Sequence, residues 1–520
     1  MKTVETDRIV IVGAGLGGLY AALALAPHPV VIVSPETLGE GSSSAWAQGG
    51  VAAAMAEADS PEAHAADTIR VGAGIVDAAV AKFVTEDARA HILGLTDLGT
   101  PFDRTSDGGY VLSREAAHGF ARVVRVKGDQ AGAAIIKSLI QKVRDCDTIQ
   151  VLEGTMALAL DVTEGAVTGI HVQNSGPDRS APVRLRGAAY LIAGGGSGGL
   201  FALTTNPQRI QGQVIGMAAR AGAIIADAEF VQFHPTAIDV GKDPAPLATE
   251  ALRGEGATLI NADGDRFMLG IHPDAELAPR DIVAREVFNQ TQAGKRPMLD
   301  TRAALGPRIK DLYPAVTEAC LQNGIDPATD PIPVAAAAHY HMGGIATNAA
   351  GQSSLGNLWV CGEASATGLH GASRLASNGL LEALVYARIC AEGIMKVHPV
   401  KQAPPVAIAF EAGGKVPDAA VVTALRRTMT DNVGVVRTQS GLLQALRDIA
   451  ALEAAQSDVP DVMSMCATAT LIAAGALTRE ESRGAHERAD FPDRHAGVGH
   501  RSMTTLAKAL ALRSQACKET

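Results

Sequence analysis

Residues 9–18 read IVIVGAGLGG, and this stretch determines the fold of the chain. The apolar run at 9–12 is typical of a strand buried on both faces of a parallel sheet. In the motif G-x-G-x-x-G the first glycine forms the turn, the second lets the backbone approach a pyrophosphate, and the third lets helix and strand pack closely. A helical segment from Leu19 to Ala26 and a second apolar run at 30–33 complete a β-α-β unit. Because the motif lies between two strands, we expect a dinucleotide site rather than a merely structural turn, formed by Gly13, Ala14, Gly15, Leu16, Gly17 and Gly18.

The acidic residue that usually follows the second strand and binds ribose is not clearly present. That strand ends Val33-Ser34-Pro35-Glu36, which places Glu36 one or two residues late. A ribose-binding carboxylate and a glutamate in a solvent-exposed turn are both consistent with this position.

Composition indicates a large globular protein. The chain has 520 residues, too many for one hydrophobic core, with 47% hydrophobic and 19% charged residues. A formal net charge of -10, without a run of Lys or Arg, argues against nucleic acid and anionic membranes as partners. Six cysteines without a C-x-x-C pair argue against disulfides and against the usual metal-site spacings, so no metal is expected. Neither a signal peptide nor an apolar stretch of membrane-spanning length is evident, so the cytoplasm is the expected location.

Changes in composition and in element length along the sequence predict three domains. Strand-then-glycine junctions recur at 191–199 and 358–362, whereas residues 233–344 have many Pro and shorter elements, with Pro331-Ile332-Pro333 as a rigid connector. After about Pro404 the sequence is helical and rich in Leu, Ala and Arg. We therefore expect an α/β protein with a Rossmann-like nucleotide-binding domain (1–232 and 345–403), an inserted α+β domain (233–344) and a C-terminal helical bundle (404–520).

Further stretches carry charged, histidine and glycine residues in a fixed order. They are SSSAWAQGG at 42–50, FHPT at 233–236, TEALRGEG at 249–256, ELAPRD at 276–281, HYHMGG at 339–344, Gly362-Glu363, and GLHGASRLASN at 368–378. In this order they resemble the flavoprotein family of succinate dehydrogenase, fumarate reductase and L-aspartate oxidase, over residues 9–492. The resemblance implies FAD in the Rossmann-like domain, a mobile capping domain at 233–344, and an active site between them at the flavin ring.

The resemblance also assigns cofactor contacts. It implies that Glu363 binds ribose or ribityl hydroxyls, and it places along the isoalloxazine ring Ser43, Gln48, Gly49, Gly50, Gly379 and Leu380. The dehydrogenase and fumarate reductase branches often carry FAD covalently on a histidine at the position of Ser43, so non-covalent FAD is expected here. Three residues depart from the family pattern and could alter FAD affinity: Pro35, Gln213 and Gly379.

Three segments are similar to the L-aspartate oxidase branch, namely 276–281, 375–378 and SREAAH at 113–118. Glu115 in the last segment has a physical reason to matter. A carboxylate facing the substrate would repel succinate but pair with the α-ammonium of aspartate. The alternative is a surface glutamate paired with Arg114 or with a later arginine.

A dicarboxylate substrate needs cationic, hydrogen-bonding groups at both ends. The resemblance implies Arg374 and His339 at one carboxylate, and around the other it implies His234, Thr249, Glu250 and Arg253. It assigns the acid/base role to Arg280, with neighbouring carboxylates relaying the proton, although arginine is a poor base with a pKa above about 12. A salt bridge to Asp281 or Glu286 is the alternative for Arg280.

Together these features predict FAD-dependent oxidation of L-aspartate to iminoaspartate, with oxygen or fumarate as the electron acceptor. The resemblance implies the first step of NAD biosynthesis and transfer of the imine to quinolinate synthase. A soluble fumarate reductase or succinate dehydrogenase flavoprotein is the nearest alternative, against which Ser43 and Glu115 argue. A silent flavin-binding protein is the other, and the complete set of substrate residues argues against it.

Overall fold

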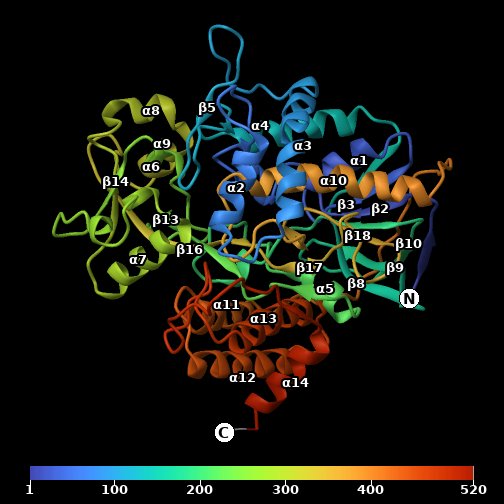
Figure 1. The fold of residues 1–520 in the computed structure, drawn as a ribbon. Helices are drawn as coiled ribbons and strands as arrows, with labels where there is room; N and C mark the ends of the chain where they lie inside the picture. The colour runs from blue at the N-terminus through green and yellow to red at the C-terminus, as the bar shows by residue number, and fades with distance from the viewer. Residues whose placement is uncertain (519–520) are drawn as a thin grey trace.

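A five-stranded parallel sheet forms the centre of the computed structural model, which describes residues 1–518 (Figure 1). The strand order is β18-β11-β2-β3-β7, and every neighbouring pair is parallel. The strands are β2 (Ile9–Val12), β3 (Val30–Val33), β7 (Ile149–Leu152), β11 (Tyr190–Ile192) and β18 (Leu358–Val360). The predicted junctions at 191 and 358 therefore continue the sheet that residues 9–12 begin.

Helix α1 (Leu16–Ala24) starts earlier than the predicted Leu19, because Gly17 and Gly18 are themselves helical. It packs against the long helix α10 (Asn378–Val397), so the two ends of the Rossmann-like domain meet on one face of the sheet. The other helices of this part are α2 (Pro61–Val71), α3 (Ala78–Asp97), α4 (Ala131–Arg144) and α5 (Gln213–Arg220), with 3-10 turns η1 (Ser43–Trp46), η2 (Gly198–Leu200) and η6 (Gly362–Ala364).

Three smaller sheets surround this centre. The first has the order β1-β10-β9-β8, with β1 (Thr3–Glu5), β10 (Val183–Arg186), β9 (Ala166–Asn174) and β8 (Thr155–Thr163). The second is β4 (Val51–Ala52), β6 (Val123–Val124) and β5 (Leu112–Ser113). The third is β19 (Ser365–Ala366), β17 (Gly344–Ala346), β12 (Ile225–Ala226) and β20 (Met503–Thr504).

The inserted segment has its own antiparallel sheet and its own buried core. The sheet order is β13 (Val231–Ile238), β16 (Ile332–His341), β15 (Met298–Asp300) and β14 (Thr258–Ile260). Around it lie α6 (Ala251–Gly254), α7 (Arg280–Gln292), α8 (Ile309–Leu312) and α9 (Pro314–Leu321), with 3-10 turns η3 (Phe267–Gly270), η4 (Ala275–Leu277) and η5 (Gly306–Arg308). A separate cluster of buried apolar residues runs from Ile238 to Val334, which supports the expected capping domain. The predicted connector is wrong, because Pro333 lies in β16 and pairs with Met298.

The C-terminal part is helical, but it starts later than expected. Residues 401–418 contain no helix, and the helices are α11 (Ala419–Val433), α12 (Gln439–Ala455), α13 (Pro460–Thr478) and α14 (Leu506–Ala516). Helix α13 is long and apolar enough to span a membrane, although the sequence shows no uninterrupted apolar stretch of that length. Of its most apolar 18 residues, 78% are buried inside the protein. It packs against α5 and α12, as a core helix does. The domain boundaries at 232, 344 and 403 stay a prediction.

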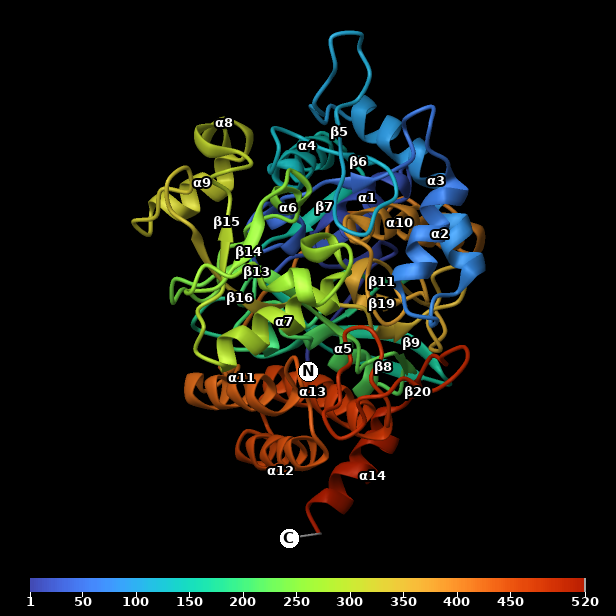
Figure 2. The same cartoon turned by 60° about the vertical axis from the view of Figure 1, so that its left-hand side comes forward.

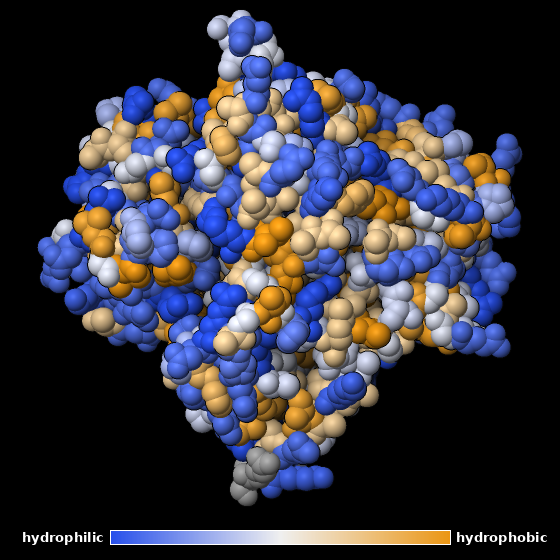
Figure 3. Space-filling view, in the orientation of Figure 1, coloured by the Kyte–Doolittle hydropathy of each residue, from blue (hydrophilic) through white to orange (hydrophobic). Residues whose placement is uncertain are grey.

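The figures show how these parts meet. The capping segment lies beside the Rossmann-like part, and the C-terminal helices lie beneath both (Figures 1 and 2). On the face in Figure 3, polar and apolar side chains are interspersed, in keeping with a chain of 19% charged residues.

Candidate active site

One cavity of about 1030 Å³ runs from the β2–α1 turn to the capping segment. Its walls come from the parallel sheet, the loop after β3, the start of α10, strands β13 and β16, and the first residue of α7. Of the predicted cofactor residues it is lined by Gly13, Ala14, Gly15, Leu16, Gly17, Ser43, Gln48, Gly49, Gly50, Glu363, Gly379 and Leu380. Of the predicted substrate and catalytic residues it is lined by Glu115, His234, Thr249, Glu250, Arg280, His339 and Arg374.

The glycines of the first turn have different surroundings. Gly13 has a φ of +108°, and a Cβ there would lie 2.4 Å from the carbonyl oxygen of Ala193. A Cβ on Gly18 would lie 2.0 Å from the carbonyl oxygen of Gly13, and Gly18 does not line the cavity. Gly15, the N-cap of α1, has no neighbour closer than 3.4 Å at that position and faces the cavity. A side chain at Gly13 or Gly18 would clash with the backbone on the buried side of the turn. The side at Gly15 faces the cavity and is open, and the N–H groups at the start of α1 point toward it.

Glu363 follows the late strand β18 and lies opposite a second glycine turn. Its Oε1 accepts a hydrogen bond of 2.9 Å from the backbone N–H of His341. A Cβ on Gly196 would lie 2.2 Å from the same oxygen, so only glycine leaves room for this carboxylate. Burial raises the pKa of Glu363 to about 7.

These features fit FAD. The cavity is long, and the N-termini of two helices, α1 and α10, open into it. Glycines stand where a Cβ would fill the space, as at Gly49 and Gly50, whose Cβ atoms would lie 2.5 Å from Glu115 Oε1 and 2.2 Å from Val124 O. Backbone N–H groups at helix N-termini are suited to a pyrophosphate and to an electron-rich ring.

Glu36 and two of the departures from the family pattern also lie on the cavity wall. Glu36 stands just beyond the end of β3 and forms an ion pair of 3.1 Å with Arg209. Gln213 accepts a hydrogen bond of 3.0 Å from the backbone N–H of Gln211 through its Oε1. Pro35 lies next to Glu36 on the same wall.

Arg280 and Glu250 form a buried ion pair at the capping end of the cavity. Arg280 Nε donates to Glu250 Oε2, and Arg280 Nη1 donates to Gln232 Oε1 at 3.1 Å. Arg253 lies behind Glu250, at 3.1 Å from its other oxygen, and does not line the cavity. Burial acts to raise the pKa of Glu250, but the two guanidinium groups bring it below its ordinary value. Glu250 is therefore ionised between two arginines.

Two neutral histidines flank this pair, with ring centroids 4.9 Å apart. Burial lowers the pKa of His234 and of His339 well below the ordinary value, and the nearby arginines add to the effect. His234 Nδ1 accepts from the backbone N–H of Thr236 at 3.2 Å, so its proton is on Nε2. His339 Nδ1 hydrogen-bonds Thr205 Oγ1 at 2.8 Å. Neutral imidazole N–H groups can donate to a carboxylate without adding charge.

Glu115 is a buried carboxylate with 3% exposure, not a surface residue. Its Oε2 accepts from Ser377 Oγ at 2.8 Å. Burial, followed by repulsion from Glu250, raises the pKa of Glu115 to about 7, although Arg280 opposes this. The alternative of a surface pair with Arg114 is therefore wrong, because Arg114 instead donates to the carbonyl of His118.

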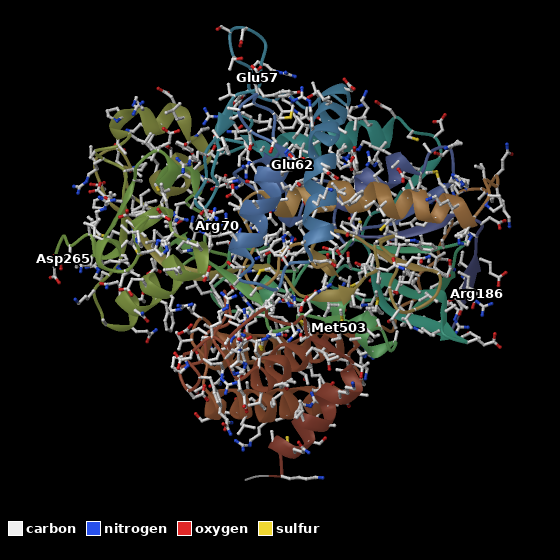
Figure 4. All side chains as sticks on the ribbon, in the orientation of Figure 1. Glu57, Glu62, Arg70, Arg186, Asp265 and Met503 are labelled. Atoms are coloured by element: carbon white, nitrogen blue, oxygen red, sulfur yellow. The ribbon has the colours of Figure 1, made fainter. Side chains whose placement is uncertain are left out.

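A network of buried charges fixes the loop that carries Glu115. Arg122 is fully buried and binds Asp59 through two hydrogen bonds of 2.9 Å, and Asp67 through one of 2.8 Å. Arg70, labelled on α2 in Figure 4, donates to the carbonyl of Ala117 at 2.6 Å. Helix α2 thus holds the loop at two points that follow Glu115 in the chain, Ala117 and Arg122.

The sequence analysis missed several residues of the site. Gln232 lies two residues before His234 on β13, so the period of a strand could have placed it on the same face. Tyr340 and Ser377 stand inside quoted motifs but were given no role. Asp129 lines the cavity from the start of α4, and no local pattern marks it.

Comparisons with known proteins agree with this geometry. The FAD binding domain family model matches residues 8–380, and the fumarate reductase flavoprotein C-term model matches residues 422–515. An L-aspartate oxidase from Caulobacter vibrioides is 48% identical over 96% of both chains. One from Mesorhizobium japonicum is 43% identical over 98% of this chain and 97% of its own. Among solved structures, an E. coli quinol fumarate reductase superposes with a TM-score of 0.88 at 26% identity, covering 97% of this chain and 95% of its own.

Proposed function

Because this chain belongs to the L-aspartate oxidase family of FAD-binding flavoproteins, we propose that it oxidises L-aspartate to iminoaspartate and reduces oxygen or fumarate. One observation carries the choice of substrate. The buried carboxylate of Glu115 shares a cavity end with two guanidinium groups, those of Arg280 and Arg374. An amino dicarboxylate offers an ammonium to Glu115 and carboxylates to Arg374, unpaired within residues 1–518, and to the histidine N–H groups, whereas succinate offers Glu115 no cation.

Bound FAD would supply the hydride acceptor. The turn after β2 and the start of α1 would hold its pyrophosphate, and Glu363 would bind a sugar or ribityl hydroxyl. The ring would lie against the loop at 42–50 and the start of α10. Glu36, one or two residues beyond the usual position after the second strand, lines the same cavity and would bind the ribose.

The substrate would lie between the ring and the capping segment. Arg374 and His339 would bind one carboxylate, and His234 Nε2–H with Thr249 the other. Arg253 would act through Glu250, since it is not in the cavity wall.

Arg280 and Glu250 would remove the proton that the substrate loses. Arg280 begins α7 and its guanidinium touches the carboxylate directly, so a proton can pass from the cavity to Glu250. Glu250 is ionised because its pKa is below the ordinary value, which keeps it ready to accept.

The test is anaerobic reduction of the FAD-loaded protein by L-aspartate and, separately, by succinate. Bleaching of the oxidised flavin by L-aspartate, reversed by oxygen or fumarate, is the expected result. Bleaching by succinate with none by L-aspartate would overturn the proposal and favour the fumarate reductase reading that the 26% identical structure suggests.

A cytoplasmic place at the start of NAD biosynthesis, with iminoaspartate passed to quinolinate synthase, is part of this proposal. The imine hydrolyses in water, so a nearby consumer would protect it. Quinolinate yield that stays constant when the two enzymes are diluted together would support direct transfer, and yield that falls with dilution would count against it.

A further inference from the structure

Arg374 differs from the other arginines of the cavity end in having no acidic partner. Among residues 1–518 it makes no ion pair, whereas Arg280 and Arg253 both contact Glu250. Its Nη1 reaches only the carbonyl of Leu375, at 3.5 Å, and its Nε has no hydrogen-bond partner. The side chain is nevertheless buried, with 5% of the residue exposed. A buried guanidinium without a carboxylate needs another source of stabilisation.

The aromatic ring of Tyr340 supplies it. Arg374 Cζ lies 4.4 Å from the centroid of this ring, well within the range of a cation–π interaction. A ring stabilises the cation without offering an oxygen that would compete with a substrate carboxylate. The guanidinium therefore keeps its hydrogen-bond donors for a ligand.

The buried carboxylate of Glu382 fixes Tyr340, and the side chains of His370 and Thr367 hold that carboxylate in place. The Tyr340 hydroxyl donates to Glu382 Oε2 at 3.1 Å, and His370 Nε2 lies 2.8 Å from the same oxygen. Thr367 Oγ1 donates to the other oxygen, Oε1, at 2.6 Å. Glu382 is 1% exposed and lies on the second turn of α10. A phenol that donates to a carboxylate gains electron density in its ring, because hydrogen-bonded groups polarise one another.

Gly379 leaves the space that the ring needs. A Cβ on this residue would lie 2.9 Å from Tyr340 Cε2 and 3.5 Å from Arg374 Nη1. The ring is thus enclosed by the start of α10, the guanidinium and Glu382.

We propose that Tyr340, fixed by Glu382 and His370, is a positioning residue that holds Arg374 as an unneutralised carboxylate clamp. This inference rests on the proposed function, because it takes Arg374 to bind a substrate carboxylate. It explains why the cavity end needs only one carboxylate, Glu250, for its other two arginines.

The experiment compares four variants of the FAD-loaded enzyme. Tyr340→Leu removes the ring, Tyr340→Phe keeps the ring and removes the hydroxyl, and Glu382→Gln removes the charge that polarises it. Tyr190→Leu is the control, since Tyr190 is also buried, on β11, but lies outside the cavity wall, and its hydroxyl accepts from the backbone N–H of Gly187. Each variant is measured for kcat and KM with L-aspartate, and for binding of succinate and of butyrate through the change in flavin absorbance.

Tyr340→Leu is expected to raise KM and the succinate Kd about 10- to 30-fold with kcat changed less than about three-fold, because a clamp binds ground state and transition state alike. The preference for succinate over butyrate should fall by the same factor. Tyr340→Phe should recover most of this loss, and Glu382→Gln should weaken succinate binding about three-fold. Tyr190→Leu should leave the succinate preference intact.

An unchanged succinate preference in Tyr340→Leu, or an equal loss in Tyr190→Leu, would overturn the proposal. Should Tyr340→Leu not retain FAD, Tyr340→Phe and Glu382→Gln decide the matter by the same measurement, and wild-type succinate affinity in both would count against it. Failure of the wild-type enzyme with L-aspartate would instead overturn the proposed function, because succinate binding is measured without turnover.

Discussion

Replacing Glu115 by Gln tests the charge that distinguishes an amino dicarboxylate from a plain one. The carboxylate is buried, with 3% exposure, so solvent screens it little. Losing one partner of a buried charge pair costs about 2–5 kcal/mol, which is roughly 30-fold to several thousand-fold in kcat/KM for L-aspartate. Fumarate has no ammonium group, so its reduction should keep its kcat/KM or improve as repulsion is removed.

The pH dependence gives a second, independent measure of the same residue. Burial raises the pKa of Glu115 to about 7, and only the ionised form pairs with an ammonium. Deprotonation of Glu115 should therefore raise kcat/KM for L-aspartate, about ten-fold per pH unit below pH 7, and kcat/KM should level off above pH 7. The Glu115→Gln variant should lack this rise.

Stopped-flow reduction by L-aspartate and turnover with fumarate, each from pH 5 to 9, measure both effects. Glu318→Gln is a suitable control, because it removes a carboxylate from the same cavity at α9, away from the substrate residues. An equal loss for L-aspartate and fumarate, or a loss below about three-fold, would refute the pairing of Glu115 with the ammonium.

Three further predictions follow from the same geometry. Arg280→Leu should lower kcat about 100- to 10,000-fold while FAD remains bound, and near-wild-type turnover would show that the proton leaves by another route. Gly379→Ser should raise KM for L-aspartate by displacing the Tyr340 ring, since its Cβ would lie 2.9 Å from Cε2; an unchanged KM would contradict this. Asp129 accepts from two backbone N–H groups of α9, at 3.0 and 3.2 Å, and burial raises its pKa to about 6. Because its pKa is raised from 3.8 to about 6 in the folded protein, stability is lost as the pH rises from about 4 to about 6, so Asp129→Asn should melt above wild type at pH 8 and by a smaller margin at pH 5. Asp129→Ala should melt lower at both, having lost a cap worth about 1 kcal/mol; equal melting of the two variants at pH 8 would refute the argument.

The sequence predicted the parts of the fold that depend on short-range patterns. The apolar runs at 9–12 and 30–33 form neighbouring parallel strands, because four consecutive apolar residues fit a sheet buried on both faces. The start of α1 was misplaced, because Gly17 and Gly18 have low helix propensity but are held in the helix by close packing on β2. Pro333 was read as a connector, yet tertiary pairing with β15 places it in a strand.

For the site too, some residues could be predicted from the sequence and others could not. Motif resemblance brought together residues from 115 to 374 that the structure places on one cavity. It could not show that Arg253 lies behind Glu250, or that Asp129 reaches α9 from the start of α4, because these depend on which side chain lies in front of another. Side-chain depth is a property of the packed protein, and no spacing in the chain encodes it.

The charges of the cavity end explain how a chain of net charge -10 can bind an amino dicarboxylate. Three arginines meet two glutamates there, and Glu250 pairs through its two oxygens with Arg253 and Arg280 but not with Arg374. Arg374 stays unpaired, and Glu115 has a pKa of about 7, so its charge adjusts to what the cavity holds. An incoming ammonium favours the ionised form of Glu115, and the substrate carboxylates are left to Arg374 and the neutral histidines. The site therefore exchanges water for a ligand whose charges it complements one by one, and the negative field of the rest of the surface is screened by salt within about 8–10 Å.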